Sequence, residues 1–359
     1  MSVALPLQGQ EEHRTHAAEP ALAPAQAQAQ AQALPSSQPP AEPRSLPSLS
    51  CVLPCLNEAR NLRALLPALV DAVSAAVQDW EIVVVDDGST DATPVLMAQW
   101  ADVPGLRCLR LSRNFGKEAA LTAGLEAAAG EVVVTMDADG QHDPELIAEL
   151  IARWRQGADM VYTVRRDRQD EPLYKRLGTG LFYRFLNAGS RFQVPAGAGD
   201  FRLMDRRVVA ALLALPERNR FMKGLYAWVG FRCEALPYTP APRANGRSRF
   251  GLARLVGLSL DGLTAFTTWP LRAVTLVGYL LALLAFGYGA FLTASYLLFG
   301  HLVSGWTTIV VGLMLFSGLQ LVSLGIVGEY VARIFEEVKR RPLYVLQSSS
   351  GKGLGERAA

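Results

Sequence analysis

Two aspartates separated by one residue, Asp137 and Asp139, follow an apolar run of β-forming residues that ends at Met136. Side chains at positions i and i+2 of a strand point to the same side, so the two carboxylates can face a common ligand. Carboxylate oxygens placed in this way suit a hard divalent ion, Mg²⁺ or Mn²⁺, bound to a phosphate. A triplet of this length specifies no function by itself, and its meaning depends on the elements that position it.

Two more polar segments, 54–58 and 86–89, follow apolar runs in the same way. Strand-like and helix-like patterns alternate along this part of the chain. Such alternation predicts an α/β fold, a mostly parallel sheet flanked by helices, in which ligands bind beyond the carboxyl ends of the strands. We therefore expect the three polar strand ends to form one site. The predicted strands are 49–53, 81–85, 106–111, 131–136 and 160–164.

Composition and missing motifs exclude several classes of protein. A net charge of +2 with 50% hydrophobic residues does not suggest a nucleic-acid partner. No Gly-x-Gly-x-x-Gly follows the first predicted strand and the sequence has no P-loop, which argues against dinucleotide oxidoreductases and P-loop NTPases. A Gly-x-Ser-x-Gly nucleophile elbow is absent too. The 4 cysteines complete no zinc pattern and are expected to be reduced thiols of a cytosolic domain.

The two ends of the chain differ from its middle. Residues 1–46 are rich in Ala, Gln and Pro, lack apolar periodicity and are predicted to form a disordered tail. Residues 273–328 contain no Asp, Glu, Lys or Arg, and this stretch fits two membrane-spanning helices, expected at 271–299 and 307–328. Basic residues flank the pair on its outer sides while the turn between the helices has no Lys or Arg, so the positive-inside rule places both flanks in the cytoplasm. The alternative is a pair of helices buried in a soluble core.

Three motifs occur in a distinctive order: Val52-Leu53-Pro54-Cys55-Leu56-Asn57-Glu58, then Val83-Val84-Val85-Asp86-Asp87-Gly88-Ser89-Thr90-Asp91, then Asp137-Ala138-Asp139-Gly140-Gln141. This order resembles that of the family 2 glycosyltransferases with a GT-A fold. Segments 199–204 and 217–224, together with the two C-terminal apolar helices, are similar to the polyprenyl-phosphate glycosyltransferases. That group includes the dolichol-phosphate mannose synthases and the bacterial bactoprenol glucosyltransferases. The resemblance covers about residues 49–346.

The resemblance implies an enzyme that transfers a sugar, with inversion, from a nucleotide sugar to the phosphate of a membrane polyprenol. A UDP-sugar is favoured as the donor, with UDP-glucose as the leading expectation. A divalent cofactor, Mg²⁺ or Mn²⁺, would be held directly by Asp139, by Asp137, which can also reach the ribose, and by Gln141. A capped turn before a helix near Pro144 is the structural alternative for these residues.

The resemblance also assigns a set of residues to the nucleotide sugar. They are Pro54, Leu56, Asn57, Glu58, Asp86, Asp87, Lys117, Asp137, Arg218, Arg220, Arg243 and Arg249. Structural alternatives remain for several of them. Glu58 could cap the next helix, one of the adjacent aspartates at 86–87 could cap the turn that follows, and Lys117 could be an exposed lysine in the first turn of a helix.

Catalytic roles are expected for Asp139, Asp200 and Arg202, and contacts with the acceptor phosphate for Arg165, Arg176 and Arg202. A phosphate monoester is mostly dianionic at neutral pH because its second pKa is about 6, so the acceptor needs little help from a base. Asp200 is expected to position groups or accept a residual proton, and a structural pair with Arg202 is the alternative. Guanidinium forks suit the oxygens of a phosphate.

The expected layout is a disordered tail at 1–46, a cytoplasmic catalytic domain at 47–245, a loop and interfacial helix at 246–269, two transmembrane helices at 270–329 and a cytoplasmic C-terminal segment at 330–359. We expect a bacterial plasma-membrane protein that contacts lipid, has both termini in the cytoplasm and forms a homo-oligomer. One competing interpretation is a processive polysaccharide synthase, although such enzymes usually carry Gln-x-x-Arg-Trp and Arg153-Trp154 lacks that Gln. The other is a non-catalytic membrane scaffold on the same fold.

Overall fold

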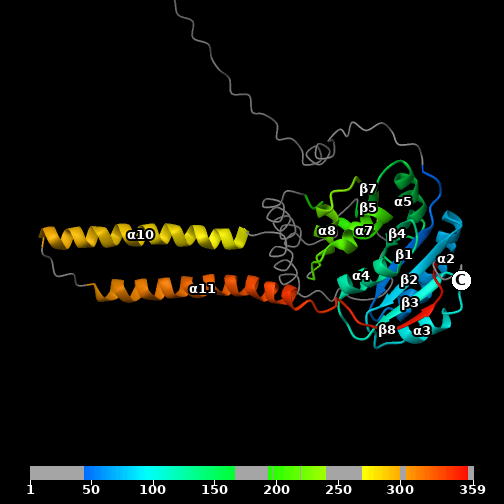
Figure 1. Cartoon of the computed structure of the whole chain (residues 1–359), viewed down its shortest axis with the longest axis horizontal. Helices are drawn as coiled ribbons and strands as arrows, with labels where there is room; N and C mark the ends of the chain where they lie inside the picture. The colour runs from blue at the N-terminus through cyan, green and yellow to red at the C-terminus, as the bar shows by residue number, and fades with distance from the viewer. Residues whose placement is uncertain are drawn as a thin grey trace, which may run out of the picture. The chain divides into compact units, whose positions relative to one another are not determined.

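The computed structural model describes residues 44–165, 193–195, 197–218, 220–239, 269–299 and 305–354. Eight strands within these residues form one sheet in the order β7-β5-β6-β4-β1-β2-β3-β8 (Figure 1). The strands are β1 (Leu49–Cys55), β2 (Trp80–Asp86), β3 (Leu106–Leu111), β4 (Val132–Thr135), β5 (Met160–Arg165), β6 (Ala198–Asp205), β7 (Cys233–Tyr238) and β8 (Leu346–Gly351). Four neighbouring pairs are parallel, whereas β6 runs antiparallel to β4 and β5, and β8 antiparallel to β3. The predicted mostly parallel α/β sheet is confirmed.

Helices cover both faces of the sheet, because successive strand residues point to opposite sides and most are apolar. One core cluster joins the sheet to α2 (Ala59–Ala76), α3 (Thr93–Gln99) and α5 (Leu146–Arg155). A second cluster joins the other face to α4 (Lys117–Ala127), α7 (Arg206–Ala214) and α8 (Met222–Trp228). Burying both faces makes the central strands a rigid support for the polar residues at their ends.

The strand directions bring the polar motifs to one edge of the sheet. β1, β2 and β4 are parallel, so their carboxyl ends lie together. β6 is antiparallel to β4, and therefore its first residues lie at this edge as well. The hydroxyl of Thr135 at the end of β4 donates to the backbone carbonyl of Asp200 in β6 at 2.7 Å, which fixes this register.

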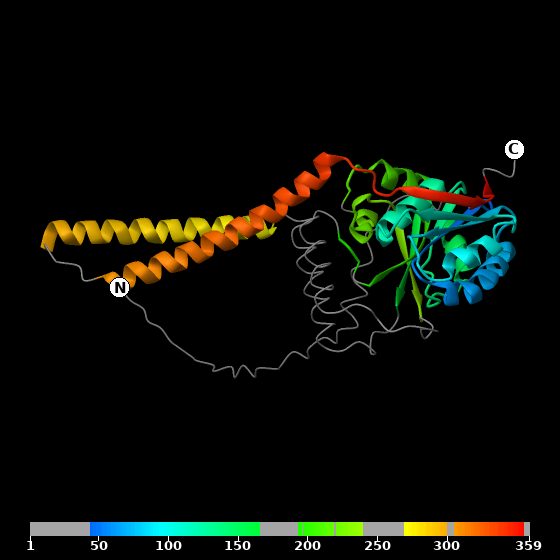
Figure 2. The same ribbon diagram turned by 90° about the horizontal axis from the view of Figure 1, so that it is seen from below.

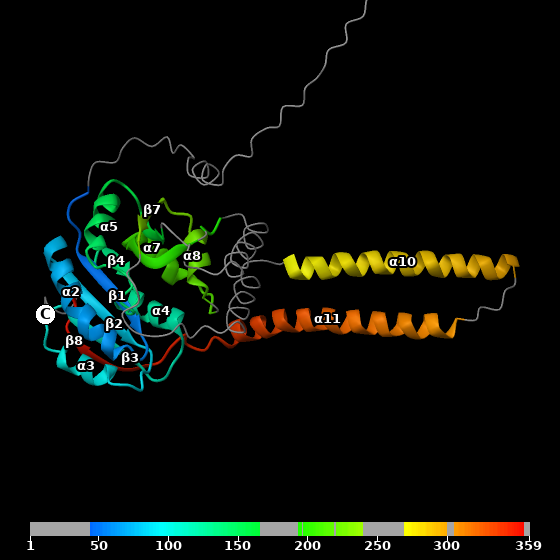
Figure 3. The ribbon, with the colours of Figure 1, turned by 180° about the vertical axis from the view of Figure 1, so that it is seen from behind.

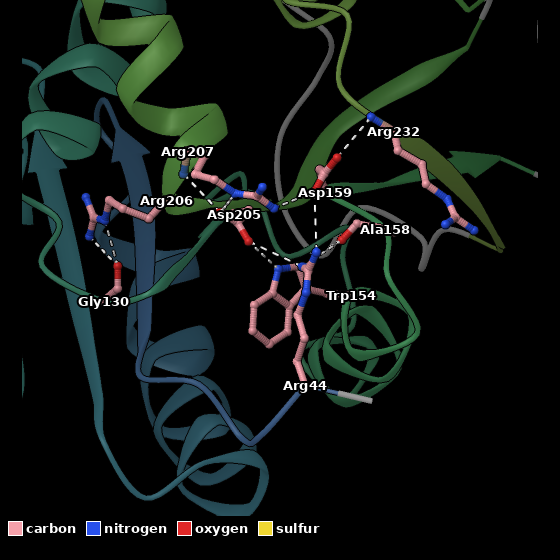
Figure 4. Close-up of polar contacts among 9 residues, drawn as sticks. All are labelled: Arg44, Gly130, Trp154, Ala158, Asp159, Asp205, Arg206, Arg207 and Arg232. Atoms are coloured by element: carbon pink, nitrogen blue, oxygen red, sulfur yellow. Dashed lines mark hydrogen bonds and ion pairs between the residues drawn. The ribbon is translucent and has the colours of Figure 1, made fainter. Parts of the chain in front are cut away.

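A network of arginines and aspartates lies at the opposite edge of the sheet (Figure 4). The guanidinium of Arg44 is 3.4 Å from Asp159 Oδ1 and 3.3 Å from Asp205 Oδ2, and it stacks 4.8 Å from the centroid of the Trp154 ring. Asp205 also caps α7 by accepting the backbone N–H of Arg207 at 3.0 Å. The folded part of the chain therefore begins by residue 44, slightly before the expected limit of the tail at residue 46.

The segment that follows the apolar helices returns to the sheet as β8 (Figure 2). Its pairing extends from Leu346 opposite Leu111 to Gly351 opposite Arg107. Just beyond it, the backbone N–H of Leu354 donates to Oε2 of Glu81, a fully buried carboxylate, at 2.9 Å. The sequence analysis did not predict this strand, and its residues belong to the same folded unit as the predicted site.

Two long apolar helices, α10 (Trp269–Phe299) and α11 (Trp306–Lys339), confirm the predicted pair (Figure 3). Each contains a segment long and apolar enough to cross a membrane, Ala273–Leu298 and Ile309–Lys339, with mean hydropathies of 1.9 and 2.2. Neither segment is buried within the described structure, so the alternative of core helices is not supported. α11 continues past the predicted end at residue 328, because no helix breaker occurs before Arg340, whose φ is 49°.

Candidate active site

Lys117, the first residue of α4, holds carboxylates from two strands together. Its Nζ lies 2.6 Å from Asp137 Oδ1, beyond the end of β4, and 2.6 Å from Asp200 Oδ2 in β6. The side chains of Lys117, Asp137 and Asp200 are 41%, 30% and 20% exposed. The structure therefore joins three of the predicted site residues in one cluster that solvent can reach.

The charges in this cluster stabilise one another. Burial works against the charged form of Lys117, but the nearby Asp200 and Asp137 outweigh this effect and raise the pKa of the ammonium. Burial likewise favours the neutral form of Asp200, yet Lys117 and Lys223 hold the pKa of this carboxyl well below its usual range. Lys117 and Asp200 are therefore both charged at neutral pH.

Asp87 fixes the backbone that leads into Lys117. Its Oδ1 accepts the N–H of Phe115 at 2.7 Å and its Oδ2 accepts the N–H of Gly116 at 2.9 Å. Gly116 has a φ of 102°, a conformation that glycine adopts without strain. Burial raises the pKa of Asp87 while the two amide donors act in the opposite direction. Both carboxylate oxygens thus position the site, whereas the predicted contact with the nucleotide stays a prediction.

Asp86 combines a structural contact through one carboxylate oxygen with a second oxygen that is buried. Its Oδ1 accepts the N–H of Ser89 at 2.8 Å, which is the capping role considered as an alternative. Its Oδ2 is buried, lies 3.6 Å from Arg110 Nε and has no hydrogen-bond partner within the described residues. Asp86, Arg110 and the β8 residues Ser348 and Ser350 help to line a pocket of about 250 Å³. The ion pair with Arg110 therefore leaves this buried oxygen without a hydrogen bond among the described residues.

Asn57 and Glu58 shape the loop after β1 through contacts within the chain. Asn57 has a φ of 59°, and its Oδ1 accepts the N–H groups of Thr90 at 2.8 Å and Asp91 at 3.2 Å. The carboxylate of Glu58 accepts the side-chain amide of Asn61 at 2.6 Å. Glu58 precedes α2 without a capping hydrogen bond from its side chain, so the alternative cap is not formed. Asn57 thus braces the loop after β2 and Glu58 the first turn of α2, and their contact with a donor stays a prediction.

Five further residues were predicted to contact the nucleotide sugar or the acceptor phosphate, and the structure describes two of them. Pro54 is buried in β1, and Leu56 is 37% exposed beyond its end. Arg176, Arg243 and Arg249 lie outside the described residues.

Asp139 and Gln141 lie in the turn after β4, close to Arg165 at the end of β5. Asp139 Oδ1 accepts the N–H of Gln141 at 3.1 Å, and Gln141 Oε1 accepts Nη2 of Arg165 at 3.3 Å. No group of three or more His, Cys, Asp or Glu is arranged for a metal within the described ranges. The carboxylates of Asp137 and Asp139 and the amide oxygen of Gln141 are nevertheless hard donors, and Asp137 already attracts a cation, the ammonium of Lys117. They fit Mg²⁺ or Mn²⁺ if phosphate oxygens complete the coordination.

Arg202 differs from its predicted role. Its side chain is almost fully buried, donates from Nη2 to the carbonyl of Gly199 at 2.6 Å, and lies 3.6 Å from the centroid of the Tyr226 ring. A guanidinium enclosed in this way cannot reach an acceptor phosphate in this conformation. The alternative ion pair with Asp200 is not formed either, because the Asp200 carboxylate pairs with Lys117. Arg202 packs behind the site and supports β6.

Arg220 is also buried rather than open to a ligand. Its Nη2 donates to the carbonyl of Leu215 at 2.8 Å and its Nε to the carbonyl of Glu217 at 3.3 Å. Burial lowers the pKa of its guanidinium. The backbone N–H of Arg218 donates to Oε1 of Glu337 at 2.8 Å, so this loop contacts the C-terminal part of α11. A donor contact is thus unsupported for Arg220 and stays a prediction for Arg218.

Two titratable residues beside the site, the buried His142 and the partly buried Glu118, were not singled out from the sequence. The ring of His142 lies 5.0 Å from Phe201 and 5.3 Å from Tyr238, between centroids, and burial lowers its pKa. Glu118 follows Lys117, and burial together with the charge of Asp200 raises the pKa of its carboxyl to about 7. Their positions directly after Gln141 and Lys117 were the available signals, but a single His or Glu on a helix or loop is not specific.

The sequence of this chain is similar to those of known glycosyltransferases. The model for glycosyl transferase family 2 matches residues 50–213. An uncharacterized glycosyltransferase of Synechocystis sp. is 41% identical over 291 residues, which make up 81% of this chain and 92% of the relative. The chain belongs to glycosyl transferase family 2. The family 2 membership predicted from the order of the motifs is therefore confirmed, and the chain is a glycosyltransferase.

Other transferases are similar over comparable lengths. The bactoprenol glucosyl transferase of Shigella phage SfII is 42% identical over 270 residues, 75% of this chain and 87% of the relative. Among solved structures, a mannosyltransferase from Pyrobaculum calidifontis in complex with GDP-Man and Mn²⁺ is 20% identical, with a TM-score of 0.43, and the match covers 74% of this chain and 86% of that one.

Proposed function

We propose that this family 2 glycosyltransferase transfers a hexose from a nucleotide sugar, with UDP-glucose as the first candidate, to the phosphate of a membrane polyprenol. The observation that carries this proposal is the similarity to bactoprenol glucosyl transferases at about 40% identity over three quarters of the chain. The acidic cluster at one sheet edge and the pair of apolar helices in the same chain are consistent with a charged donor and a lipid acceptor.

The donor would lie along the carboxyl ends of β1, β2 and β4. Asp86 Oδ2 would accept a hydrogen bond from the base or ribose, since this buried oxygen has no hydrogen bond among the described residues and Asp86 lines the pocket shared with Arg110. Asp87 holds the loop before α4, and through that loop it aims Lys117 at the place where the diphosphate would lie. Prearranged charges of this kind account for most of the rate enhancement in many enzymes.

Asp137, Asp139 and Gln141 would hold Mg²⁺ or Mn²⁺ beside the diphosphate. The ion would supply charge neutralisation for the departing nucleoside diphosphate. Asp200 sits at the same edge and keeps a full negative charge at neutral pH, because Lys117 and Lys223 depress its pKa. It would orient Lys117 rather than remove a proton from an acceptor that is already dianionic.

The acceptor phosphate would attack the anomeric carbon in one displacement with inversion. Arg165, exposed at the end of β5, and Arg176 are the proposed phosphate partners. Arg202 is not proposed for this role, because it is buried against Tyr226. The hydrophobic tail of a polyprenol would remain in the bilayer.

The pairing of β8 with β3 constrains how the chain crosses a membrane. β8 follows the apolar helices in sequence and forms one sheet with strands that precede them. The chain must therefore return to its starting side, which requires an even number of crossings. We propose that α10 and α11 each cross once, with the catalytic domain (47–245), the interfacial segment (246–269) and the C-terminal segment (330–359) on the cytoplasmic side, as the basic flanks indicate.

The decisive experiment uses the full chain in lipid nanodiscs that contain polyprenyl phosphate. Radiolabelled UDP-glucose, UDP-galactose, GDP-mannose and UDP-N-acetylglucosamine are supplied in turn with Mn²⁺ or Mg²⁺. We expect one donor to give a lipid-extractable sugar that requires both the metal and the acceptor. A sugar polymer would favour the processive synthase, and donor binding without any product would favour the scaffold. The predicted homo-oligomer is tested on the same sample by mass photometry.

A further inference from the structure

The ammonium of Lys117 occupies the acidic edge at which the proposed function requires a divalent ion. We propose that Lys117 is a built-in counter-cation: it neutralises Asp137 and Asp200 while the site is empty, and it exchanges Asp137 for the diphosphate of the donor once a divalent ion binds, while it keeps its contact with Asp200. This inference rests on the proposed function, and it assigns Lys117 the task of coupling metal binding to donor binding.

The location of Lys117 is unfavourable by helix electrostatics alone. It is the first residue of α4, where the positive end of the helix dipole disfavours a cation. The backbone ahead of it is nevertheless fixed by the two hydrogen bonds that Asp87 accepts from Phe115 and Gly116. A residue held against its local preference by dedicated contacts is typical of a functional position.

The two ion pairs of the Lys117 ammonium are short, yet both are accessible to solvent. Both N–O distances are 2.6 Å, and they reach carboxylates on two different elements. The lysine side chain is 41% exposed and Asp137 is 30% exposed, so water can replace either contact. Ion pairs that solvent reaches in this way are weak compared with the coordination of a divalent ion by carboxylates.

A divalent ion and this ammonium cannot share Asp137 without cost. The ammonium lies 2.6 Å from Oδ1, and a second cation on the same carboxylate would repel it at short range. If the ion takes Asp137 and Asp139, Lys117 loses one of its two partners. A diphosphate beside the helix end then offers the ammonium a new anionic partner, so metal and diphosphate should bind with positive coupling.

The first measurement is the affinity of Mn²⁺ for the purified full chain without nucleotide. The EPR signal of free Mn²⁺ reports how much of the ion remains unbound during the titration. In Lys117→Met the competing ammonium is gone, and we expect Mn²⁺ to bind about tenfold more tightly. Lys117→Arg keeps the charge and should bind Mn²⁺ as the wild type does. Lys223→Met is the matched control, because Lys223 also acts on Asp200 electrostatically. It should change the Mn²⁺ affinity much less.

The second measurement is the affinity for UDP at saturating Mn²⁺, measured by calorimetry on the same variants. Lys117→Met should now bind UDP about tenfold more weakly, because the proposed new partner of the diphosphate is missing. Opposite signs in the two measurements are the signature of an exchanging cation. Loss of fold would weaken both affinities, and a purely structural lysine would leave the Mn²⁺ affinity unchanged or lower. Either of these results overturns the proposal.

The two proposals can fail separately. If Lys117→Met gives both expected shifts but no donor yields a lipid-linked sugar, the cation exchange stands and the proposed acceptor is wrong. If the wild type forms lipid-linked sugar but Lys117→Met binds Mn²⁺ no more tightly than the wild type, the acceptor stands and the exchange is wrong.

Discussion

Two clusters built from similar residues lie at opposite edges of the same sheet, and they use charge differently. At one edge Lys117 bridges Asp137 and Asp200 through side-chain contacts only. At the other edge Asp205 accepts from a guanidinium, from the indole of Trp154 at 3.0 Å and from a backbone N–H that begins α7 (Figure 4).

The difference lies in how many fixed partners each carboxylate has. The side chain of Asp205 is 12% exposed and that of Asp137 is 30% exposed. When a buried aspartate is hydrogen-bonded to backbone and indole donors, loss of any of these partners destabilises the folded state. An aspartate paired with a flexible, half-exposed lysine can change partners with little loss of folding free energy. The Arg44 network, which comprises Arg44, Trp154, Asp159, Asp205 and Arg207, is suited to hold the fold. The Lys117 cluster, which comprises Lys117, Asp137 and Asp200, is suited to bind ligands.

The largest effect should come from the acidic turn. Asp139→Ala removes one of the hard oxygen donors proposed for the metal, and we expect sugar transfer to fall by about 10³-fold or more. The measurement is the initial rate of lipid-linked product formation at saturating donor. Asp143→Ala, a change at an exposed aspartate in the same loop, is the matched control and should keep activity within a few-fold. Normal turnover in Asp139→Ala would remove this edge from the mechanism.

The sequence predicted this edge better than it predicted the contacts within it. Strands β1 to β5 follow from apolar runs, and their ends follow from the polar motifs, because both are local patterns. The pairing of Lys117 with Asp200 joins residues 83 positions apart, and only the insertion of an antiparallel β6 beside β4 creates it. The burial of Arg202 could not be predicted for the same reason. It depends on Tyr226 of α8, which packs against β6 from a distant part of the chain.

The strand β8 could not be predicted from its own residues. Leu-Gln-Ser-Ser-Ser-Gly lacks the alternating apolar pattern and the β-branched residues typical of strands. It is a strand because β3 offers it an unpaired edge. In addition, the backbone N–H of Leu354, just beyond β8, donates to the buried carboxylate of Glu81 in β2. Tertiary pairing here outweighs local propensity.

Removing β8 should give the second-largest effect and should act on stability. A chain that ends at residue 345 exposes the edge of β3 and leaves one oxygen of Glu81 buried without its donor, and we expect the free energy of unfolding to fall by about 3 kcal/mol. Urea unfolding in one detergent, followed by tryptophan fluorescence, measures it. A chain that ends at Leu354 keeps the pairing and should match the full chain. Equal stability of all three would show that β8 is dispensable.

A smaller loss is expected from the Arg44 network. Asp205→Ala removes the cap of α7 and the acceptor for Trp154, and should lower the free energy of unfolding by about 2 kcal/mol. Arg207→Ala, at a side chain that is 64% exposed, should cost less than about 0.5 kcal/mol. Sugar transfer per folded molecule should be unchanged in both, because neither residue lies at the site. A fall in turnover with unchanged stability would contradict the contrast between the two edges.

The smallest effect should be a change in the stability of the fold with pH, caused by the carboxyl of Asp205 in the Arg44 network. Burial works against the charged form of Asp205, but the backbone N–H of Arg207, the indole of Trp154 and the guanidinium of Arg207 outweigh it and lower the pKa of the carboxyl below its ordinary value of 3.8. A carboxyl whose pKa is lower in the folded state binds fewer protons there, so its stabilising effect is complete above pH 3.8 and is lost as the pH falls toward the folded value.

Asp205→Asn removes this titration, so the difference in melting temperature between the wild type and this variant should be constant from pH 7 to about pH 5 and should shrink between about pH 4 and pH 3. The change should amount to less than about 1 kcal/mol, because solvent still reaches part of the network. A difference that stays constant down to pH 3 would mean that Asp205 stabilises the fold through packing rather than charge, and the two edges would then differ in kind and not only in the number of partners.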